Sequence, residues 1–103
     1  MIEKIKKQVR AGSYRFTIHA FERCVERGIS PEQVKSAILS GEIIEDYPND
    51  KYGPSCLIHG VTREQNILHV QCSIEPVWIV TVYDPTLNPE EWDEDYKTRR
   101  KKS

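Results

Sequence analysis

The stretch SPEQVKSAILSGEIIEDY, residues 30–47, carries the clearest structural signal in the chain, because it holds a helix start, a helix end and a strand. Ser30 can cap a helix whose first position is Pro31, and Gln33 completes a capping box. Apolar residues then recur at helical spacing until Gly41, where the pattern changes to that of a strand. The stretch therefore predicts a helix over residues 31–40 and a strand over 43–47. The helix should face inward with Val34, Ala37 and Ile38.

Two further helices are expected before this stretch. Residues 2–9 place apolar side chains at helical spacing between lysines, and Gly12 closes the pattern. Residues 19–27 form the second pattern, and Gly28 suits the left-handed position that commonly ends a helix. The expected inward face of this second helix consists of Phe21, Cys24 and Val25.

The chain after residue 54 changes to strand patterns. Alternating or β-branched residues predict strands over 55–60, 67–73 and 77–83. With the strand over 43–47, this gives about four antiparallel strands, of which the last should be central or covered on both sides. These strands form the expected sheet.

A second helix-start pattern follows near the C-terminus. Leu87, Asn88, Pro89 and Glu91 repeat the staple, cap, proline and capping-box positions, which predicts a helix over about 89–99. Trp92 and Tyr96 would share one face of it. We therefore expect a single α+β domain over residues 1–103, with N-terminal helices packed on a short antiparallel sheet, a C-terminal helix, and a flexible basic tail over 100–103.

Composition excludes two classes of protein. Hydrophobic residues make up 38% of the chain, too many for a disordered segment, and charged residues make up 30%, which interrupts any membrane span. The N-terminus lacks the apolar run of a secretory signal. Cys24, Cys56 and Cys72 form an odd set at wide spacing, which argues against a disulfide framework and for a reducing compartment. We expect buried thiols, a cytoplasmic location and no membrane association.

A possible zinc motif is discounted by strand geometry. Cys56 and His59 are three residues apart, and so are His69 and Cys72. Residues i and i+3 of a strand project to opposite faces, so neither pair can reach one ion. The sequence therefore predicts no metal site.

Charge is distributed unevenly along a chain whose net charge is only −1. Residues 1–27 carry seven lysines or arginines against three glutamates, and a basic run from Lys97 follows the acidic segment 84–96. Either basic end could meet phosphate groups. The alternative is that these charges belong to solvated helix faces and a frayed tail.

One histidine and two arginines stand four residues apart on the second predicted helix. His19, Arg23 and Arg27 therefore share a face, where an imidazole and two guanidiniums could cradle a phosphate. The alternative is that Glu22 and Glu26 pair with the arginines as ordinary surface charges. Spacing alone favours neither interpretation.

His69 and Tyr83 are the other candidates for chemistry. His69 lies in mid-strand on the face opposite Leu68 and Val70, and Tyr83 ends the most apolar strand. A connecting loop of three residues would place the two side chains on one face, whereas a loop of two or four would separate them. The alternative for each residue is a structural role. His69 would be a hydrogen-bonded histidine, and Tyr83 would be a tyrosine at the edge of the core.

The order of several strings is more specific than any single residue. IHAFERCVERGIS, GEIIEDYPNDKYGPSCLIHG, LHVQCS and IVTVYDP are followed by a tail that contains a tryptophan and ends in arginines. In this order they resemble the bacterial and archaeal DUF4258 family, a domain of unknown function, over about residues 18–99.

This resemblance implies a fold and an activity. The fold would be like that of the RelE and barnase group of metal-independent ribonucleases, and the protein would be the toxin of a type II toxin–antitoxin pair. It would cleave RNA without a cofactor or metal, and a small zinc-finger, antitoxin-like protein would be its partner. The alternative is a non-catalytic protein- or RNA-binding module that docks this zinc-finger partner, with Trp92 and Tyr96 suited to the interface.

The resemblance also implies site residues by position. The catalytic candidates are His19, Arg23, His69 and Tyr83, and the candidates for binding RNA phosphates are Arg27 and Arg99. Metal-free cleavage needs a base, an acid and cations that hold the phosphate. His19 and His69 are candidates for acid and base, and the sequence does not assign which is which.

Overall fold

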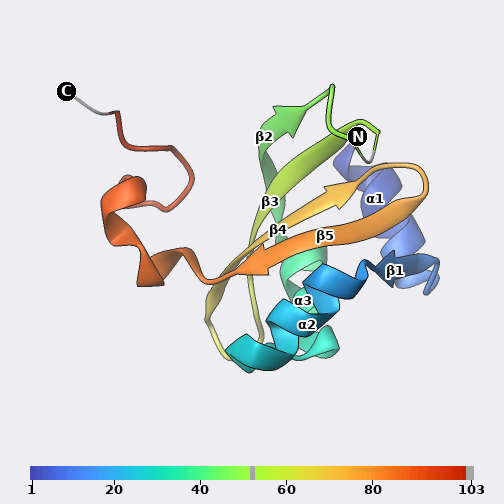
Figure 1. Cartoon of the computed structure of the whole chain (residues 1–103), viewed down its shortest axis with the longest axis horizontal. Helices are drawn as coiled ribbons and strands as arrows, with labels where there is room; N and C mark the ends of the chain where they lie inside the picture. Colours follow the sequence, from blue (N-terminus) through green and yellow to red (C-terminus); the bar gives the residue numbers. More distant parts are fainter. Residues whose placement is uncertain (52, 102–103) are drawn as a thin grey trace.

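A mixed β-sheet with the strand order β1-β5-β4-β3-β2 forms the centre of the protein (Figure 1). The structure is a computed structural model that describes residues 1–51 and 53–101. Within those residues it has three α-helices, five strands and two 3₁₀ turns. In chain order they are α1 (Ile2–Arg10), β1 (Tyr14–Phe16), α2 (Ile18–Arg27), α3 (Pro31–Ser40), β2 (Glu42–Tyr47), β3 (Ser55–Val61), β4 (Ile67–Ser73), β5 (Val77–Tyr83), η1 (Pro85–Leu87) and η2 (Pro89–Glu91). No helix in this described part of the chain is long and apolar enough to cross a membrane.

The sheet is mixed because its first strand runs parallel to its neighbour. β2, β3, β4 and β5 pair antiparallel in sequence order, as the strand patterns predict, and β5 lies inside the sheet. β1 pairs parallel with the first part of β5, with Tyr14 opposite Val77 and Phe16 opposite Ile79. The expectation of about four antiparallel strands is therefore wrong, since the described residues add a fifth, parallel strand. A three-residue strand with a distant partner leaves too short a pattern to be detected in the sequence.

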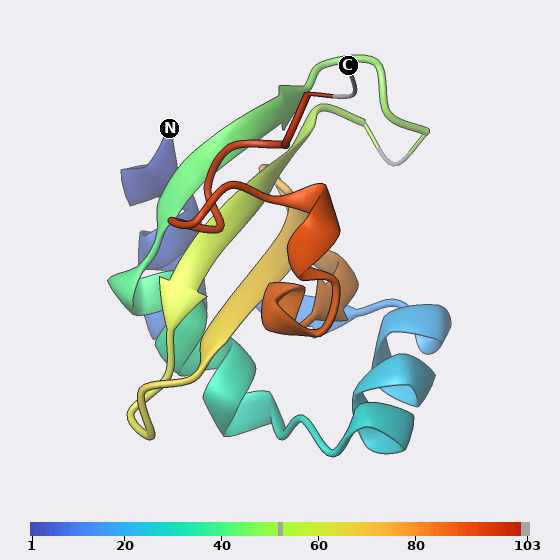
Figure 2. The same ribbon diagram turned by 90° about the vertical axis from the view of Figure 1, so that its left-hand side faces the viewer.

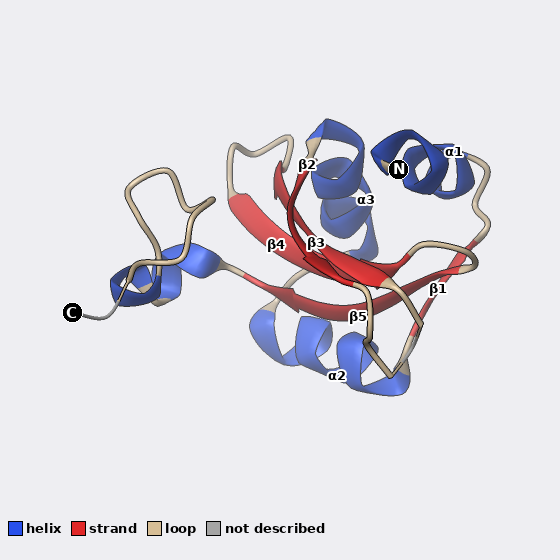
Figure 3. Cartoon of the chain, turned by 90° about the horizontal axis from the view of Figure 1, so that it is seen from above, coloured by secondary structure: helices blue, strands red, loops and turns tan. Residues whose placement is uncertain are grey.

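The helices lie on both sides of the sheet. Figure 3 shows α1 and α3 on one side and α2 on the other, beside β5. α3 approaches β3 so closely that a Cβ atom on Gly60 would fall 1.8 Å from the Ala37 carbonyl oxygen, so only glycine fits there. The buried core includes Ile5, Val9, Val34, Ala37, Ile38, Cys56, Ile58, Val70, Cys72, Ile79 and Val82.

The three predicted N-terminal helices are present. α3 starts with the predicted capping box, in which the Ser30 hydroxyl accepts from the Gln33 N–H and the Gln33 side chain accepts from the Ser30 N–H. Its predicted inward side chains are all buried. α2 ends at Gly28, which has a φ of 68°. Local start and stop signals therefore predicted these helices correctly.

The predicted inward face of α2 is wrong for two of its three residues. Cys24 is buried, but Phe21 and Val25 are 54% and 66% exposed, and Ala20 is buried instead. Positions 20 and 24 are one turn apart, so the smaller pair fits the same helical period. α2 packs closely against β5. Its small side chains, Ala20 and Cys24, face the sheet, and its large side chains, Phe21 and Val25, face outward.

The predicted C-terminal helix over 89–99 is also wrong. After β5 the chain forms η1 and η2 and then leaves helical geometry at Trp92, where φ is −128° and ψ is 153°. Trp92 is 1% exposed, and burial of its indole against the sheet outweighs a short helix that would be marginal alone. Of the expected tail over 100–103, Lys102 and Ser103 lie outside the described residues.

Candidate functional site

The sheet face that carries His59 and His69 is covered by residues 85–101, here named the C-terminal segment. Figure 2 shows this segment in front of the sheet, and Figure 1 shows it continuing from the end of β5. The segment folds back on itself, and the Arg100 N–H donates to the Glu91 carbonyl. Its fixed shape therefore depends on local hydrogen bonds and on side chains that contact the strands.

His69 and Tyr83 are direct partners in the sheet. The β4–β5 loop has three residues, 74–76, and the register pairs His69 with Tyr83 after a shift between Gln71 and Cys72. The two side chains share a face, and the Tyr83 hydroxyl lies 3.1 Å from His69 Nδ1. Of the alternatives that the sequence leaves open, the structure has the one that brings these residues together.

The surroundings of His69 determine which ring nitrogen carries its proton. His69 is fully buried, and its Nε2 lies 2.6 Å from the Tyr96 carbonyl oxygen, which can only accept, so Nε2 carries the hydrogen. Burial lowers the pKa of His69 to about 4, so the ring is neutral at pH 7 and Nδ1 accepts from the Tyr83 hydroxyl. Burial also raises the pKa of Tyr83 to about 12, which keeps that hydroxyl protonated. Both ring nitrogens of His69 are thus engaged.

Aromatic rings from three elements surround His69. Its ring centroid lies 4.4 Å from that of Trp92, which is edge-on, 5.2 Å from that of Tyr83 and 5.6 Å from that of His59. His59 is also buried, and burial lowers its pKa. Its Nε2 atom has no hydrogen-bond partner among the described residues. The cluster is a closed, ring-lined site between the sheet and the C-terminal segment.

Two ion pairs connect the C-terminal segment to the edge strand β2. Arg99 Nε donates to Glu45 Oε2 at 2.8 Å, and Lys97 Nζ lies 3.4 Å from Glu42 Oε1. The Arg99 guanidinium carbon also lies over the Trp92 ring, 4.7 Å from its centroid. Arg99, which the resemblance assigns to RNA phosphate, is therefore engaged by a carboxylate and an indole in this arrangement.

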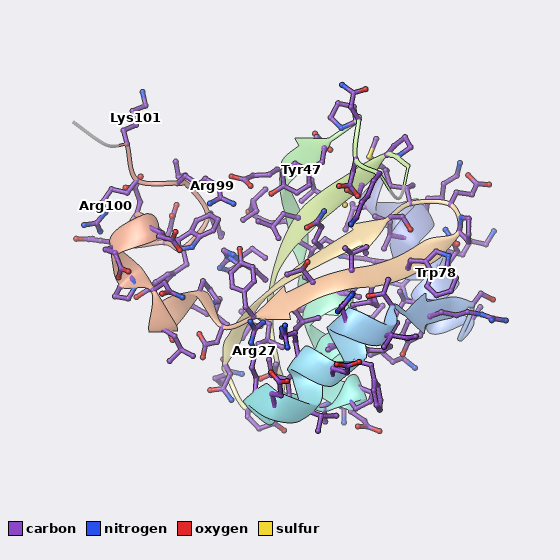
Figure 4. All side chains as sticks on the ribbon, viewed as in Figure 1. Arg27, Tyr47, Trp78, Arg99, Arg100 and Lys101 are labelled. Atoms are coloured by element: carbon purple, nitrogen blue, oxygen red, sulfur yellow. The ribbon has the colours of Figure 1, made fainter. Side chains whose placement is uncertain are left out.

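Glu45 is the centre of a small charged network. Its carboxylate accepts from the Tyr47 hydroxyl as well as from Arg99. Burial alone would raise the pKa of Glu45, but these two hydrogen bonds outweigh it and lower the pKa, so the carboxylate is ionised at pH 7. Figure 4 shows Tyr47 and Arg99 approaching each other from β2 and the C-terminal segment, whereas Arg100 and Lys101 lie further from the sheet.

Sequence reasoning missed several members of this site. Glu45 and Tyr47 are two residues apart in a strand and so share a face, which is a signal that the sequence offered. The sequence indicates His59 only as part of the zinc-like spacing with Cys56. Trp92, expected as part of a partner interface, is instead buried against His69, and nothing local in the sequence places residue 92 against β4.

His19 and Arg23, on α2, are separate from this cluster. Both are exposed, and among the described residues no hydrogen bond or ion pair joins either one to His69. Arg23 Nη1 lies 3.1 Å from each carboxylate oxygen of Glu26. This is the surface pairing that the sequence left open as the alternative to a phosphate cradle.

Arg27 is the α2 candidate nearest to the cluster. Its Nη1 donates to the Val82 carbonyl at 2.5 Å, directly beside Tyr83 in the chain. Figure 4 shows Arg27 below the end of β5. This bond ties the end of α2 to the strand that carries the candidate tyrosine.

The sheet separates the cysteines from the histidines of the two zinc-like spacings. Cys56 lies opposite Cys72 and faces the core, while His59 lies opposite His69 and contacts its ring. In each pair the cysteine and the histidine, three residues apart, therefore point to opposite faces of the sheet, as strand geometry requires. Cys24, Cys56 and Cys72 are buried free thiols. No group of three or more potential ligands comes together in the described part of the chain.

Comparison with known protein families assigns the chain to one of them. The family described as Domain of unknown function (DUF4258) matches residues 16–84, more than half of the 103 residues, and the chain belongs to this family. The matched region includes His19, His69 and Tyr83, and it ends where the C-terminal segment begins. Comparison with curated proteins and with solved structures found no match. The family description names no activity, so function has to be argued from the site.

Proposed function

We propose that the protein is a metal-independent ribonuclease, the toxin of a type II toxin–antitoxin pair, with its site at His69 and Tyr83. The observation that supports the proposal is the hydrogen-bonded imidazole and phenol on one sheet face, inside the family's matched region. Such a pair can exchange protons with a substrate without a metal ion. Arg27, bonded to the Val82 carbonyl next to Tyr83, can supply positive charge for a phosphate. Arg99 lies on the segment that covers the pair, so its role in binding phosphate remains a prediction.

The proposed reaction is attack of a ribose 2′-OH on the adjacent phosphorus. A base takes the 2′-OH proton as the bond from O2′ to phosphorus forms, the bond from phosphorus to O5′ breaks, and an acid gives a proton to O5′. The products are a 2′,3′-cyclic phosphate and a 5′-hydroxyl end, so no further reagent is needed. In this proposal His69 and Tyr83 carry the two proton transfers, and arginines stabilise the developing charge on the phosphate.

In the proposal, the arrangement seen here is a closed form of the site. His69 is fully buried, and its Nε2 donates to the Tyr96 carbonyl. RNA can therefore reach the ring only after the C-terminal segment withdraws. Withdrawal would free Nε2 and remove the burial that lowers the pKa, which returns the ring to the range where it exchanges protons near neutral pH.

His19 and Arg23 remain predictions as catalytic residues. In the proposal they bind RNA that continues from the sheet onto α2, with Arg27 at the junction between the two. A proton transfer by His19 would require one RNA phosphate to contact both α2 and the end of β5.

The test is cleavage of a single-stranded RNA by the purified full chain in the presence of EDTA. We expect the wild type to cut and to leave 2′,3′-cyclic phosphate ends. Tyr83→Phe, which removes only the hydroxyl, and His69→Gln should each cut at least about 10²-fold more slowly, the usual loss for a general acid or base. Tyr14→Phe on β1 is the matched control and should cut like the wild type.

Two outcomes would contradict this proposal. Wild-type cleavage rates in Tyr83→Phe and His69→Gln, with folding verified by circular dichroism, would clear both residues of a catalytic role. Intact RNA after incubation with the folded wild type would contradict ribonuclease activity altogether.

A second candidate function is docking of the small zinc-finger partner that the resemblance implies. The observation that favours it is an exposed apolar stripe on α2, where Ile18, Phe21 and Val25 are 76%, 54% and 66% exposed. Apolar side chains that recur at helical spacing on a surface helix are typical of helix-mediated binding. Phe21→Asp should abolish partner binding in calorimetry, while Lys35→Asp on α3 should not. Unchanged affinity of the Phe21 variant would exclude this surface.

A further inference from the structure

We propose that the buried position of the Trp92 indole is a nucleobase-binding slot, which the chain fills with its own C-terminal segment when no RNA is bound. The proposal rests on the proposed function, since it names the part of the RNA that this site would hold. It adds a specificity element and an autoinhibitory contact to that function.

The surroundings of Trp92 resemble those of a bound base. The indole is 1% exposed, lies edge-on to the His69 ring at 4.4 Å and carries the Arg99 guanidinium over its face at 4.7 Å. Proteins hold unstacked bases against aromatic side chains, and a purine is close in size to an indole. When the segment leaves, Arg99 leaves with it, and a space lined by His59, His69 and Tyr83 remains.

The slot also offers a polar group for the edge of a base. His69 Nε2 donates to the Tyr96 carbonyl in the closed form and is free for proton transfer once the segment leaves, so the polar group available to the edge of a base is on His59. His59 Nε2 is buried and lacks a hydrogen-bond partner among the described residues. A buried polar atom without a partner is costly, and a polar edge in the slot would satisfy it. This second observation points to a ligand with hydrogen-bonding groups rather than to an apolar side chain.

The C-terminal segment is attached in a way that lets it leave. Two ion pairs between described residues join the segment to the sheet. The side chains of Lys97 and Glu42 are 40% and 59% exposed, and such surface pairs contribute little to stability, whereas in the pair of Arg99 with Glu45 the glutamate side chain is only 21% exposed. The segment follows β5 and lies outside the family's matched region. It contributes no strand to the sheet of β1 to β5, so its withdrawal breaks no pairing between these strands. Release therefore requires that a ligand replace the contacts of the indole and of the Tyr96 carbonyl and that the two ion pairs to β2 break.

The test follows hydrogen exchange in the full chain by NMR. Trp78 and Trp92 are the two tryptophans of the sequence, and Trp78→Phe assigns their indole signals. A single-stranded RNA oligonucleotide should speed exchange at the Trp92 indole and at the amides of residues 85–101, while the amides of α3 stay unchanged. Inorganic phosphate, which has no base, should leave the Trp92 indole protected.

A variant that loosens the segment gives an independent measurement. Glu42→Gln combined with Glu45→Gln, here called the anchor variant, removes the β2 carboxylates of both ion pairs and keeps their partners, Lys97 and Arg99. The matched control is Glu32→Gln combined with Glu64→Gln, two exposed glutamates away from the segment, which changes the net charge equally. Relative to this control, the anchor variant should exchange segment amides about 3- to 30-fold faster and bind the RNA tighter by a similar factor.

The results separate this proposal from the ribonuclease proposal. RNA that displaces Trp92 without being cut supports the slot and contradicts the ribonuclease. Cleavage of RNA while the Trp92 indole stays protected supports the ribonuclease and overturns the slot. The slot is also overturned if RNA does not bind, or if the anchor variant and its control bind RNA equally.

Discussion

At the scale of single residues, the neutral state of His69 makes stability depend on pH. Its Nε2–H donates to the Tyr96 carbonyl and its Nδ1 accepts from the Tyr83 hydroxyl, so a second proton would place a charge in a buried site and force the Tyr83 hydroxyl to accept instead of donate. Burial lowers the pKa from 6.5 to about 4. Between these two values the unfolded chain binds a proton at this position and the folded chain does not.

We therefore expect the free energy of unfolding to fall as the pH is lowered from about 6.5 to about 4. His69 should contribute at most about 3 kcal/mol to this loss, and none of it above the unfolded pKa. Urea denaturation at a series of pH values measures the effect. His69→Gln should flatten the dependence, whereas His19→Gln, at an exposed position, should retain it. An identical slope in wild type and His69→Gln would show that the ring is not held neutral.

The position of His69 was partly predictable from sequence. Alternation over residues 67–73 predicts that His69 faces away from Leu68 and Val70, and the structure confirms this. Its complete burial was not predictable, because the covering residues, Trp92 and Tyr96, come from a segment that the sequence assigns to a helix. Residue patterns show which face a side chain takes but not what covers that face.

At the scale of elements, the capping box makes α3 the most strongly specified helix. Ser30→Ala removes the acceptor for the Gln33 N–H and should lower the free energy of unfolding by about 1 kcal/mol. Ser36→Ala, in the middle of the same helix, is the matched control and should change it by less than about 0.5 kcal/mol. Thermal or urea unfolding measures both variants. Equal losses would mean that the cap contributes nothing specific.

The same start pattern gives a helix at α3 and only a 3₁₀ turn at η2, for a physical reason. After the capping box of α3, buried side chains recur at helical spacing, so packing extends the helix. After Glu91, the chain offers Trp92 and then three consecutive acidic residues, 93–95, which have nothing to pack against. Burying the indole in an extended conformation is the better solution, and the helix ends. Start signals are therefore reliable only where an apolar stripe follows them.

At the scale of the whole molecule, the α+β class and the order of most elements follow from local patterns. The parallel pairing of β1 with β5 does not, because it joins distant parts of the chain through a three-residue strand. The candidate site divides in the same way. His69 and Tyr83 come together as one sequence alternative required, while His19 and Arg23 stay on the exposed part of α2. Pairings within the meander from β2 to β5 were predictable, whereas the pairing of β1 and the position of the C-terminal segment were not.

The boundary of the family match suggests how the molecule is organised. The matched region, residues 16–84, contains α2, α3 and strands β2 to β5 with the His69–Tyr83 pair. The C-terminal segment lies beyond this region and closes the face on which the pair lies. A closed site on the matched core, covered by a segment outside it, is the arrangement on which both proposals depend.

¹⁵N NMR of the His69 ring in the full chain tests this closed arrangement most directly. At pH 7 the structure predicts a protonated Nε2 that donates to the Tyr96 carbonyl and an unprotonated Nδ1 that accepts from the Tyr83 hydroxyl. It also predicts a titration midpoint near a pKa of about 4. A ring that titrates near pH 6.5, with both nitrogens exchanging between tautomers, would show that the C-terminal segment does not cover His69 and would contradict the closed site.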